Sequence, residues 1–171
     1  MDGVDAALVR FGDHSLDVVA THQHDYPGPL RHALIAARSL PDRQRSDQVL
    51  ELNRLVGECF RDATLELLAG AGVDATSGRA IGSHGQTLRH APDAAEPYSL
   101  QGGDPDIIAA GTGVATIADF RRADIEHGGQ GAPLAPAFHA WLFRRAGKTR
   151  VVLNIGGIAN ITVLYGDDRP T

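Results

Sequence analysis

The longest regular pattern in the chain is an amphipathic one that runs from about Asp47 to Leu68. Apolar residues recur at spacings of three and four, as in a helix with one buried face; they are Val49, Leu52, Leu55, Val56, Cys59, Phe60, Ala63, Leu67 and Leu68. Asp47 is placed to cap the start of this helix, and Gly70 or Gly72 to end it. Since 43% of its 171 residues are hydrophobic, the chain can bury a real core around the helix.

Shorter patterns surround this helix. Strands are expected over residues 5–11, 14–21, 79–83, 114–118, 150–155 and 158–165, helices over 30–40, 104–110 and 132–146, and a loop over 22–29. The first two strands form a hairpin, and the Gly156-Gly157 pair predicts a second hairpin with a two-residue turn. Helices alternate with short strands, so the fold class is α/β.

Composition excludes several classes of protein. The formal charge of −5 argues against nucleic acid, because a duplex binder needs a basic face to displace counterions. No apolar run approaches the roughly 20 residues of a membrane span, and no signal peptide opens the chain, so a cytoplasmic protein is expected. Cys59 is the one cysteine, so no internal disulfide forms, and its apolar surroundings predict a packed, inert thiol.

Two candidate sites combine glycines with polar groups near strands. In Met1–Asp5, the carboxylates of Asp2 and Asp5 flank a glycine and could hold a hydrated Mg²⁺ ion near a phosphate, although Asp-Gly turns are common. Gly82–His90 follows a predicted strand and offers hydrogen-bonding groups for a polyhydroxylated ligand; these are His84, Gln86, Thr87 and His90. A turn with a capping histidine is the alternative for this segment.

A third candidate segment is Asp119–Gly131. Asp119 stands where a predicted strand ends and a loop begins, and Asp124 follows five residues later. Arg121 and Arg122 could bind a carboxylate of the substrate. Its glycines allow the backbone to pass close to a ligand, and a solvated loop is the alternative. The remaining pair, His22 and His24, is assigned to a surface loop.

Taken together, the motifs resemble the anhydro-N-acetylmuramic acid kinases over nearly the whole chain. The matching segments are Ile81–Thr87, His90-x-Pro92, Leu100–Asp104, Ala118–Asp124, Gly128–Leu134 and Leu153–Thr162. The resemblance implies an actin-like ATPase fold whose two lobes are built on RNase H-like sheets, with the nucleotide between them. It implies a sugar-binding, catalytic N-terminal lobe over residues 1–148 that lacks its first strand. Residues 149–171 would be the first hairpin of the nucleotide-binding C-terminal lobe.

The resemblance also implies an activity. ATP phosphorylates the 6-oxygen of 1,6-anhydro-N-acetylmuramic acid while water opens the anhydro bridge, giving N-acetylmuramic acid 6-phosphate in cell-wall recycling. The partners expected are the sugar, ATP and Mg²⁺, with a homodimer as the oligomer and no nucleic acid or membrane.

Roles for single residues follow from the same resemblance. Asp119 is expected to be the catalytic base, with Asp124 as second choice. Asp2 and Asp5 are the expected metal ligands. The expected nucleotide-binding residues are Met1, Asp2, Gly3, Val4, Asp5, Gly156 and Gly157. The expected substrate-binding residues are His84, Gln86, Thr87, His90, Gln101, Arg121 and Gly129.

Parts of the family pattern are missing from this sequence. The Gly-Thr-Ser start of the first nucleotide motif is absent, and so is the later glycine-rich part of the C-terminal lobe. The chain by itself is therefore expected to bind ATP poorly and not to turn over. Alternatives are another actin-like phosphotransferase, a non-catalytic sugar-binding lobe, and, weakly, an RNase H-like nuclease that uses Asp2 and Asp5.

Overall fold

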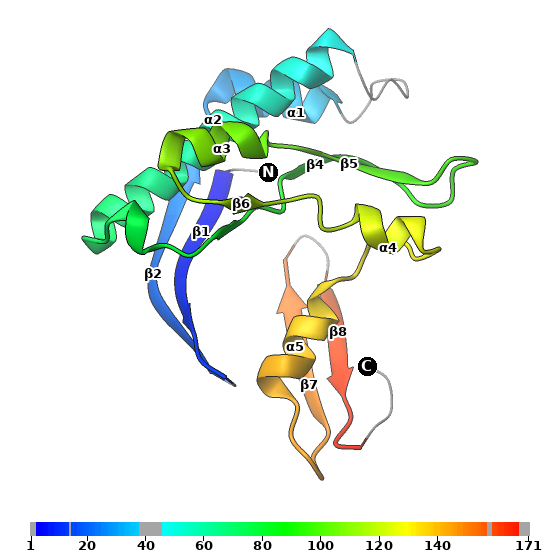
Figure 1. Ribbon diagram of the computed structural model, residues 1–171. Helices are drawn as coiled ribbons and strands as arrows, with labels where there is room; N and C mark the ends of the chain where they lie inside the picture. The colour runs from blue at the N-terminus through cyan, green and yellow to red at the C-terminus, as the bar shows by residue number, and fades with distance from the viewer. Residues whose placement is uncertain (1–2, 14, 38–45, 157–158, 168–171) are drawn as a thin grey trace. The chain divides into compact units, whose positions relative to one another are not determined.

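The computed structural model describes residues 3–13, 15–37, 46–156 and 159–167, and it has a mixed α/β architecture (Figure 1). The strands are β1 Gly3–Phe11, β2 Leu16–Asp25, β3 Ile81–Gly82, β4 Gln86–Ala91, β5 Tyr98–Gly102, β6 Thr116–Ile117, β7 Arg150–Ile155 and β8 Ala159–Leu164. The helices are α1 Gly28–Ala37, α2 Asp47–Ala71, α3 Pro105–Thr112, α4 Arg122–Glu126 and α5 Ala135–Phe143, with a 3₁₀ turn at Ala75–Ser77. The α/β class is confirmed, and the actin-like lobe stays a prediction.

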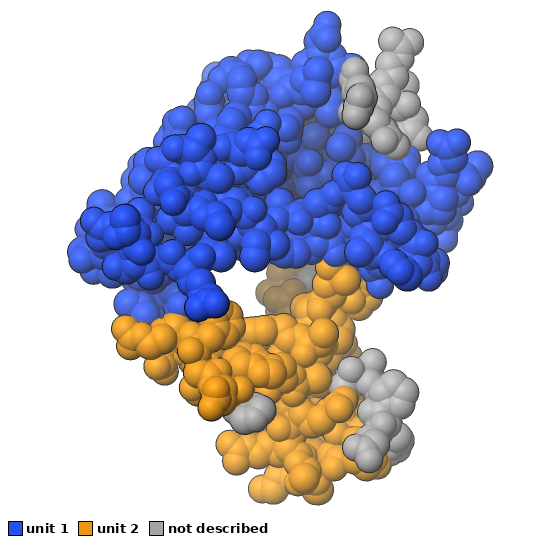
Figure 2. All heavy atoms as spheres, in the orientation of Figure 1, with its two compact units in different colours: residues 1–9, 18–131 blue, residues 10–17, 132–171 orange. Residues whose placement is uncertain are grey.

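The chain divides into two compact units (Figure 2). The first contains residues 1–9 and 18–131, and the second contains residues 10–17 and 132–171. This division differs from the expected lobes, 1–148 and 149–171, which stay a prediction. All the helices from α1 to α4 belong to the first unit.

The long helix α2 begins and ends on side-chain and backbone caps. The hydroxyl of Ser46 accepts a hydrogen bond from the amide of Val49 at 3.3 Å, so Ser46 is the N-cap. The expected cap, Asp47, is instead the first helical residue, where its charge favours the helix dipole. Gly72 ends the helix in the left-handed conformation, with φ of 65°, as expected from its lack of a Cβ.

The core of the first unit lies between α1, α2 and the strands. Its buried members are Val4, Tyr26, Leu30, Leu34, Ala37, Val49, Leu52, Val56, Cys59, Ala63 and Leu88. Helix α2 supplies five of these eleven residues at the predicted spacing, more than any other element, and Leu34 and Val56 are at most 1% exposed. The thiol of Cys59 is buried, as expected, and this burial raises its pKa.

Among the described residues, the strands form four two-stranded sheets. Strands β3 and β6 are parallel, whereas β4 with β5 and β7 with β8 are antiparallel hairpins. Helix α3 lies between β5 and β6 in the chain, packs on α2, and begins at the predicted Asp104-Pro105 cap. The backbone amide of Asp106 donates to the Asp104 carboxylate at 2.9 Å, which fixes this cap.

The structure corrects three sequence-based expectations. Residues 22–29 are not one loop, because β2 continues to Asp25 and α1 begins at Gly28. The segment after Ser83 contains the hairpin β4–β5, which was not predicted because its strands are polar. The expected loop after Asp119 contains the short helix α4.

In the second unit, α5 packs against the hairpin β7–β8. A hydrogen bond of 3.0 Å joins Nδ1 of His139 to the hydroxyl of Thr162. The register ends with Ile155 opposite Ala159, so three residues rather than the expected two connect the strands. No helix in the described part of the chain has the length and apolar character to cross a bilayer.

Candidate functional site

Two of the predicted segments meet at one edge of the parallel pair β3–β6. Ile81 lies opposite Thr116, and the amide of Ser83 donates to the carbonyl of Ile117 at 2.8 Å. Parallel strands end at the same edge, so the residues that follow them, His84 and Asp119, emerge together. Ligand sites in α/β proteins form at such edges.

Asp119 has an unusual backbone conformation. Among the described residues, it is the one non-glycine residue with positive φ, at 59°. Asp and Asn tolerate this region better than other side chains, and residues held there often serve a function. The carboxylate is 44% exposed and forms an ion pair of 2.5 Å with Arg122. Asp119 is therefore fixed in place and accessible to a ligand.

His84 is oriented by Arg121. The Nε of Arg121 donates to Nε2 of His84 at 3.0 Å, and Nδ1 of His84 lies 2.9 Å from the carbonyl of Gly85. Because a guanidinium only donates, Nε2 must accept, which places the imidazole proton on Nδ1, where it donates to Gly85. The contact joins the segment after β3 to the segment after β6.

Asp124 is engaged within its own loop. Its Oδ2 accepts from the amide of Gly131 at 2.6 Å, and its backbone carbonyl accepts from the amide of Gly129 at 2.8 Å. A Cβ on Gly129 would meet the Asp124 carboxylate, so a larger residue there would displace this side chain. Asp124 thus holds the glycine-rich turn against the end of α4, a structural use of its carboxylate.

The hairpin β4–β5 carries a polar face. A bulge between Thr87 and Arg89 shifts the register, so that Thr87 lies opposite Gln101 and His90 lies opposite Ser99. Nε2 of Gln101 donates to Ser99 at 2.7 Å and to Thr87 at 3.4 Å, and Nδ1 of His90 lies 3.1 Å from the Ser99 hydroxyl. Four hydrogen-bonding side chains therefore share one side, and without the bulge His90 would be on the other side.

Gln86 is held by a buried tyrosine. Its Oε1 accepts from the hydroxyl of Tyr26 at 3.4 Å, and its Nε2 donates to the carbonyl of Thr87 at 3.5 Å. Burial, and to a lesser degree the nearby Cys59, raises the pKa of Tyr26, so its hydroxyl stays protonated and donates. The predicted ligand contact at Gln86 competes with these two hydrogen bonds.

Helix α2 and two glycines keep the hairpin in position. The side-chain oxygen of Asn53 accepts a hydrogen bond from the amide of Gly103 at 2.9 Å, and the backbone carbonyl of Asn53 accepts one from the amide of Asp104 at 3.1 Å. Gly85 has φ of 73°, and a Cβ there would lie 2.8 Å from the carbonyl of Gly102. Since α4 packs against β5, the polar hairpin and the Asp119 segment belong to one region of the first unit.

The expected nucleotide-binding residues are only partly described. Met1, Asp2 and Gly157 lie outside the described residues. Gly3 to Asp5 begin strand β1 rather than forming a turn; Val4 is buried in the core, and the Asp5 side chain is exposed. Gly156 is exposed at the end of β7 in the second unit.

Sequence reasoning missed two residues of this region, Ser99 and Ser83. Ser99 links His90 to Gln101. Arg122 was expected to steady a substrate carboxylate, and in the structure it pairs with Asp119. Ser83 is 4% exposed, and its hydroxyl finds no hydrogen-bond partner among the described residues. Ser99 could have been found from the sequence, because it stands two residues before Gln101 and so lies on the same face of the strand.

Comparison with known proteins gives a consistent result. The model of the family "Anhydro-N-acetylmuramic acid kinase" matches residues 1–171. Relatives carrying that name are 50% identical over 167 residues in Shewanella amazonensis, 51% over 170 in Shewanella loihica and 48% over 172 in Coxiella burnetii. Each match covers 98% of this chain but only 44–45% of the relative, so the chain spans less than half the length of these proteins.

Proposed function

The chain belongs to the anhydro-N-acetylmuramic acid kinase family, and we propose that it supplies the sugar-handling part of an ATP-dependent kinase for 1,6-anhydro-N-acetylmuramic acid. The product is N-acetylmuramic acid 6-phosphate, formed in cell-wall recycling. The observation that carries the proposal is the meeting of His84 and Asp119 at one sheet edge beside a polar hairpin.

The anhydro sugar has no free 6-hydroxyl, so two bond changes must be coupled. The bond between the anomeric carbon and the bridging oxygen breaks, and that oxygen attacks the γ-phosphorus of ATP. At the phosphorus, the bond to the oxygen that bridges the β- and γ-phosphates breaks, and ADP leaves. Water attacks the anomeric carbon and gives up one proton to a base, which leaves a hydroxyl on that carbon. A positioned base contributes about 10²–10⁴-fold to such a step.

Asp119 is the base in this proposal. Its carboxylate is accessible and lies at the strand edge, and its left-handed backbone fixes the direction in which the side chain leaves the chain. Asp124 is the weaker candidate, because one of its carboxylate oxygens already accepts from the Gly131 amide.

The polar face of β4–β5 is the proposed sugar-binding surface. Hydroxyl, amide and imidazole groups suit the hydroxyl and acetamido groups of the sugar; they belong to Thr87, His90, Ser99 and Gln101. Arg121 uses Nε on His84, and the other donors of its guanidinium are suited to the lactyl carboxylate. Gly129 lets the backbone approach the ligand closely.

By family resemblance, residues 1–5 of the first unit are assigned to Mg²⁺ and the phosphates of ATP, and, separately, Gly156 and Gly157 of the second unit are assigned to ATP. The exposed carboxylate of Asp5 suits Mg²⁺, which proteins hold through one or two carboxylates together with substrate phosphates. When bound, the ion neutralises charge on the transferring phosphoryl group. Asp2 and Gly157 are assigned here by family resemblance alone, and Gly3, Val4 and Gly156 would contribute backbone amides.

The test uses a chimera in which these 171 residues replace the matching segment of the Shewanella amazonensis relative. We expect ADP release that depends on 1,6-anhydro-N-acetylmuramic acid, with little activity on hexoses or polyphosphate. The 171-residue chain alone should show no such turnover. Equal activity on an unrelated sugar would favour another phosphotransferase, and sugar binding without turnover in the chimera would favour a non-catalytic binding lobe.

A further inference from the structure

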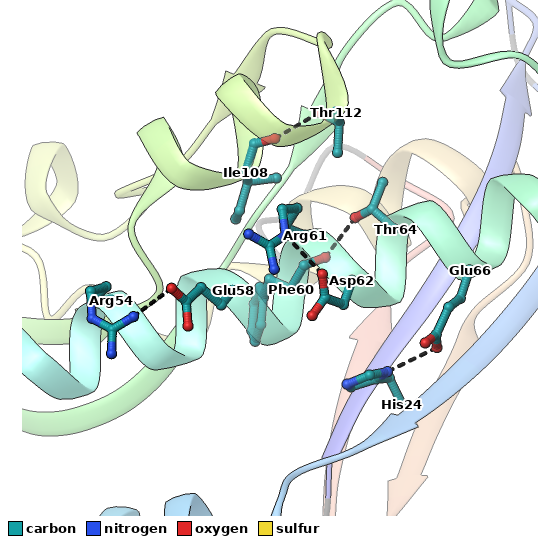
Figure 3. Close-up of polar contacts among 10 residues, drawn as sticks. All are labelled: His24, Arg54, Glu58, Phe60, Arg61, Asp62, Thr64, Glu66, Ile108 and Thr112. Carbon is teal, nitrogen blue, oxygen red and sulfur yellow. Dashed lines mark hydrogen bonds and ion pairs between the residues drawn. The ribbon is translucent and has the colours of Figure 1, made fainter.

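A cluster of two histidines and one glutamate, none of them assigned a role above, joins β2 to α2 in the first unit. Figure 3 shows His24 of β2 pointing at Glu66 of α2. His22 lies two residues before His24, so the alternation of the strand puts both imidazoles on the same, half-buried face.

The three side chains converge on one point. Oε2 of Glu66 lies 2.8 Å from Nε2 of His22 and 2.9 Å from Nδ1 of His24. The hydrogen bond from His24, and then that from His22, lowers the pKa of Glu66. Among the described residues, this is the group of His, Cys, Asp or Glu side chains whose ligand atoms all lie within 4.8 Å of one another.

We propose that His22, His24 and Glu66 bind a divalent transition metal, with Zn²⁺ as the natural occupant. Two imidazoles and a carboxylate are ligands that Zn²⁺ takes, with water in the fourth position. Zinc–ligand bonds of about 2.0–2.2 Å place tetrahedral ligand atoms roughly 3.4 Å apart. The two separations from Glu66 are 2.8 and 2.9 Å, and all three ligand atoms lie within 4.8 Å of one another, so rotations of these partly exposed side chains would bring the atoms to this spacing.

The location suits a structural metal site. The histidines lie 44 and 42 residues before Glu66 in the chain, and they belong to a strand whereas Glu66 belongs to the longest helix. A metal bound to both elements would stabilise the folded first unit, because binding to the native state alone lowers its free energy. The side chains are 32%, 20% and 51% exposed, so an ion can enter from solvent.

The rival explanation is a hydrogen-bond network that needs no metal. Each imidazole would donate one proton to the carboxylate oxygen, and the pair of contacts would be complete without an ion. The two explanations differ in their response to added Zn²⁺.

The experiment titrates Zn²⁺ into the chelator-treated 171-residue chain, free of any histidine tag, by calorimetry. Co²⁺ is used in parallel for its visible d–d absorption. We expect one ion per chain, and a rise in Tm of about 5–10 °C when Zn²⁺ is at 100 times its Kd. Binding should weaken strongly at pH 5.5, because protons compete with Zn²⁺ for the same ligand atoms.

Variants decide whether the ion is at this site. His24→Ala and Glu66→Gln should each weaken Zn²⁺ binding by more than about tenfold. Loss of a residue that only hydrogen-bonds to a metal ligand already costs about tenfold, and loss of a ligand should cost more. The matched control His32→Ala, at an exposed histidine of α1, should leave binding unchanged. Circular dichroism verifies the fold of each variant. The proposal is overturned if the wild type binds no Zn²⁺, or if the folded Glu66→Gln and His24→Ala variants bind it as tightly as the wild type.

Discussion

Replacing Asp119 by Asn tests the proposed base with little effect on the fold. Asn removes the negative charge but keeps the shape of the side chain, and it tolerates the positive φ of 59°. The ion pair with Arg122 joins two exposed side chains, so its loss should cost about 1 kcal/mol or less. We expect the Tm of the 171-residue chain to change by no more than about 4 °C.

The effect on catalysis should be far larger. Loss of a general base lowers the rate by about 10²–10⁴-fold, which corresponds to roughly 2.7–5.4 kcal/mol in the activation free energy. KM for the sugar should change little, because the base acts mainly in the transition state. The assay is coupled ADP release by the chimera described above, with the anhydro sugar varied at saturating ATP.

Two matched variants separate the possible causes. Arg122→Gln removes the ion pair but keeps the carboxylate, so its turnover should stay within about tenfold of the wild type. Asp119→Ala should lose activity and also lose about 1–2 kcal/mol of stability, since Ala is strained at positive φ. Wild-type turnover in Asp119→Asn would refute the assignment, and so would a loss in Arg122→Gln as large as in Asp119→Asn.

Other predictions concern stability and binding. Leu34→Ala should destabilise the first unit by about 2–5 kcal/mol, because the side chain is 1% exposed; a urea midpoint that does not move would contradict the core described here. The pKa of Glu66 is lowered in the folded chain, so as pH falls below the ordinary value of 4.5 the unfolded chain binds more protons than the folded chain. The free energy of unfolding of the metal-free chain should therefore fall in that pH range. Glu66→Gln should make this free energy depend less on pH, as measured by unfolding at a series of pH values. Gln101→Leu should weaken sugar binding by about 3–10-fold in calorimetry, whereas equal affinity would remove the hairpin from the sugar site.

Sequence patterns predicted the parts of the fold that depend on local spacing. The helix α2 was expected over 47–68 and extends over 47–71, because its apolar positions follow the helical period and Gly72 is needed at its end. The cap assignment was one residue off, since Ser and Asp are equally good caps and stand side by side at 46 and 47.

Elements without an apolar pattern were harder to predict. The hairpin β4–β5 is made of polar strands, one side of which carries the proposed ligand-binding groups, so alternation of hydrophobic residues gave no signal. The bulge after Thr87 decides which side His90 faces, and only the register reveals it. His22 and His24 do alternate on β2, but the prolines that follow favoured a loop.

The candidate site was predicted as separate segments, and their assembly required the structure. Asp119 was identified by its position at a strand end, and the parallel register of β3 and β6 explains why His84 emerges at the same edge. The contact between Arg121 and His84 joins side chains 37 residues apart, a pairing that no local pattern encodes.

The most direct test of the account is a titration of the ¹⁵N-labelled 171-residue chain with 1,6-anhydro-N-acetylmuramic acid, followed by amide chemical shifts. We predict that the shifts concentrate in Gly82–Gly102 and Asp119–Gly131, and that ATP alone causes only weak changes. If the folded chain shows no sugar-dependent shifts, or if they lie on β7 and β8 instead, the proposed sugar site is wrong.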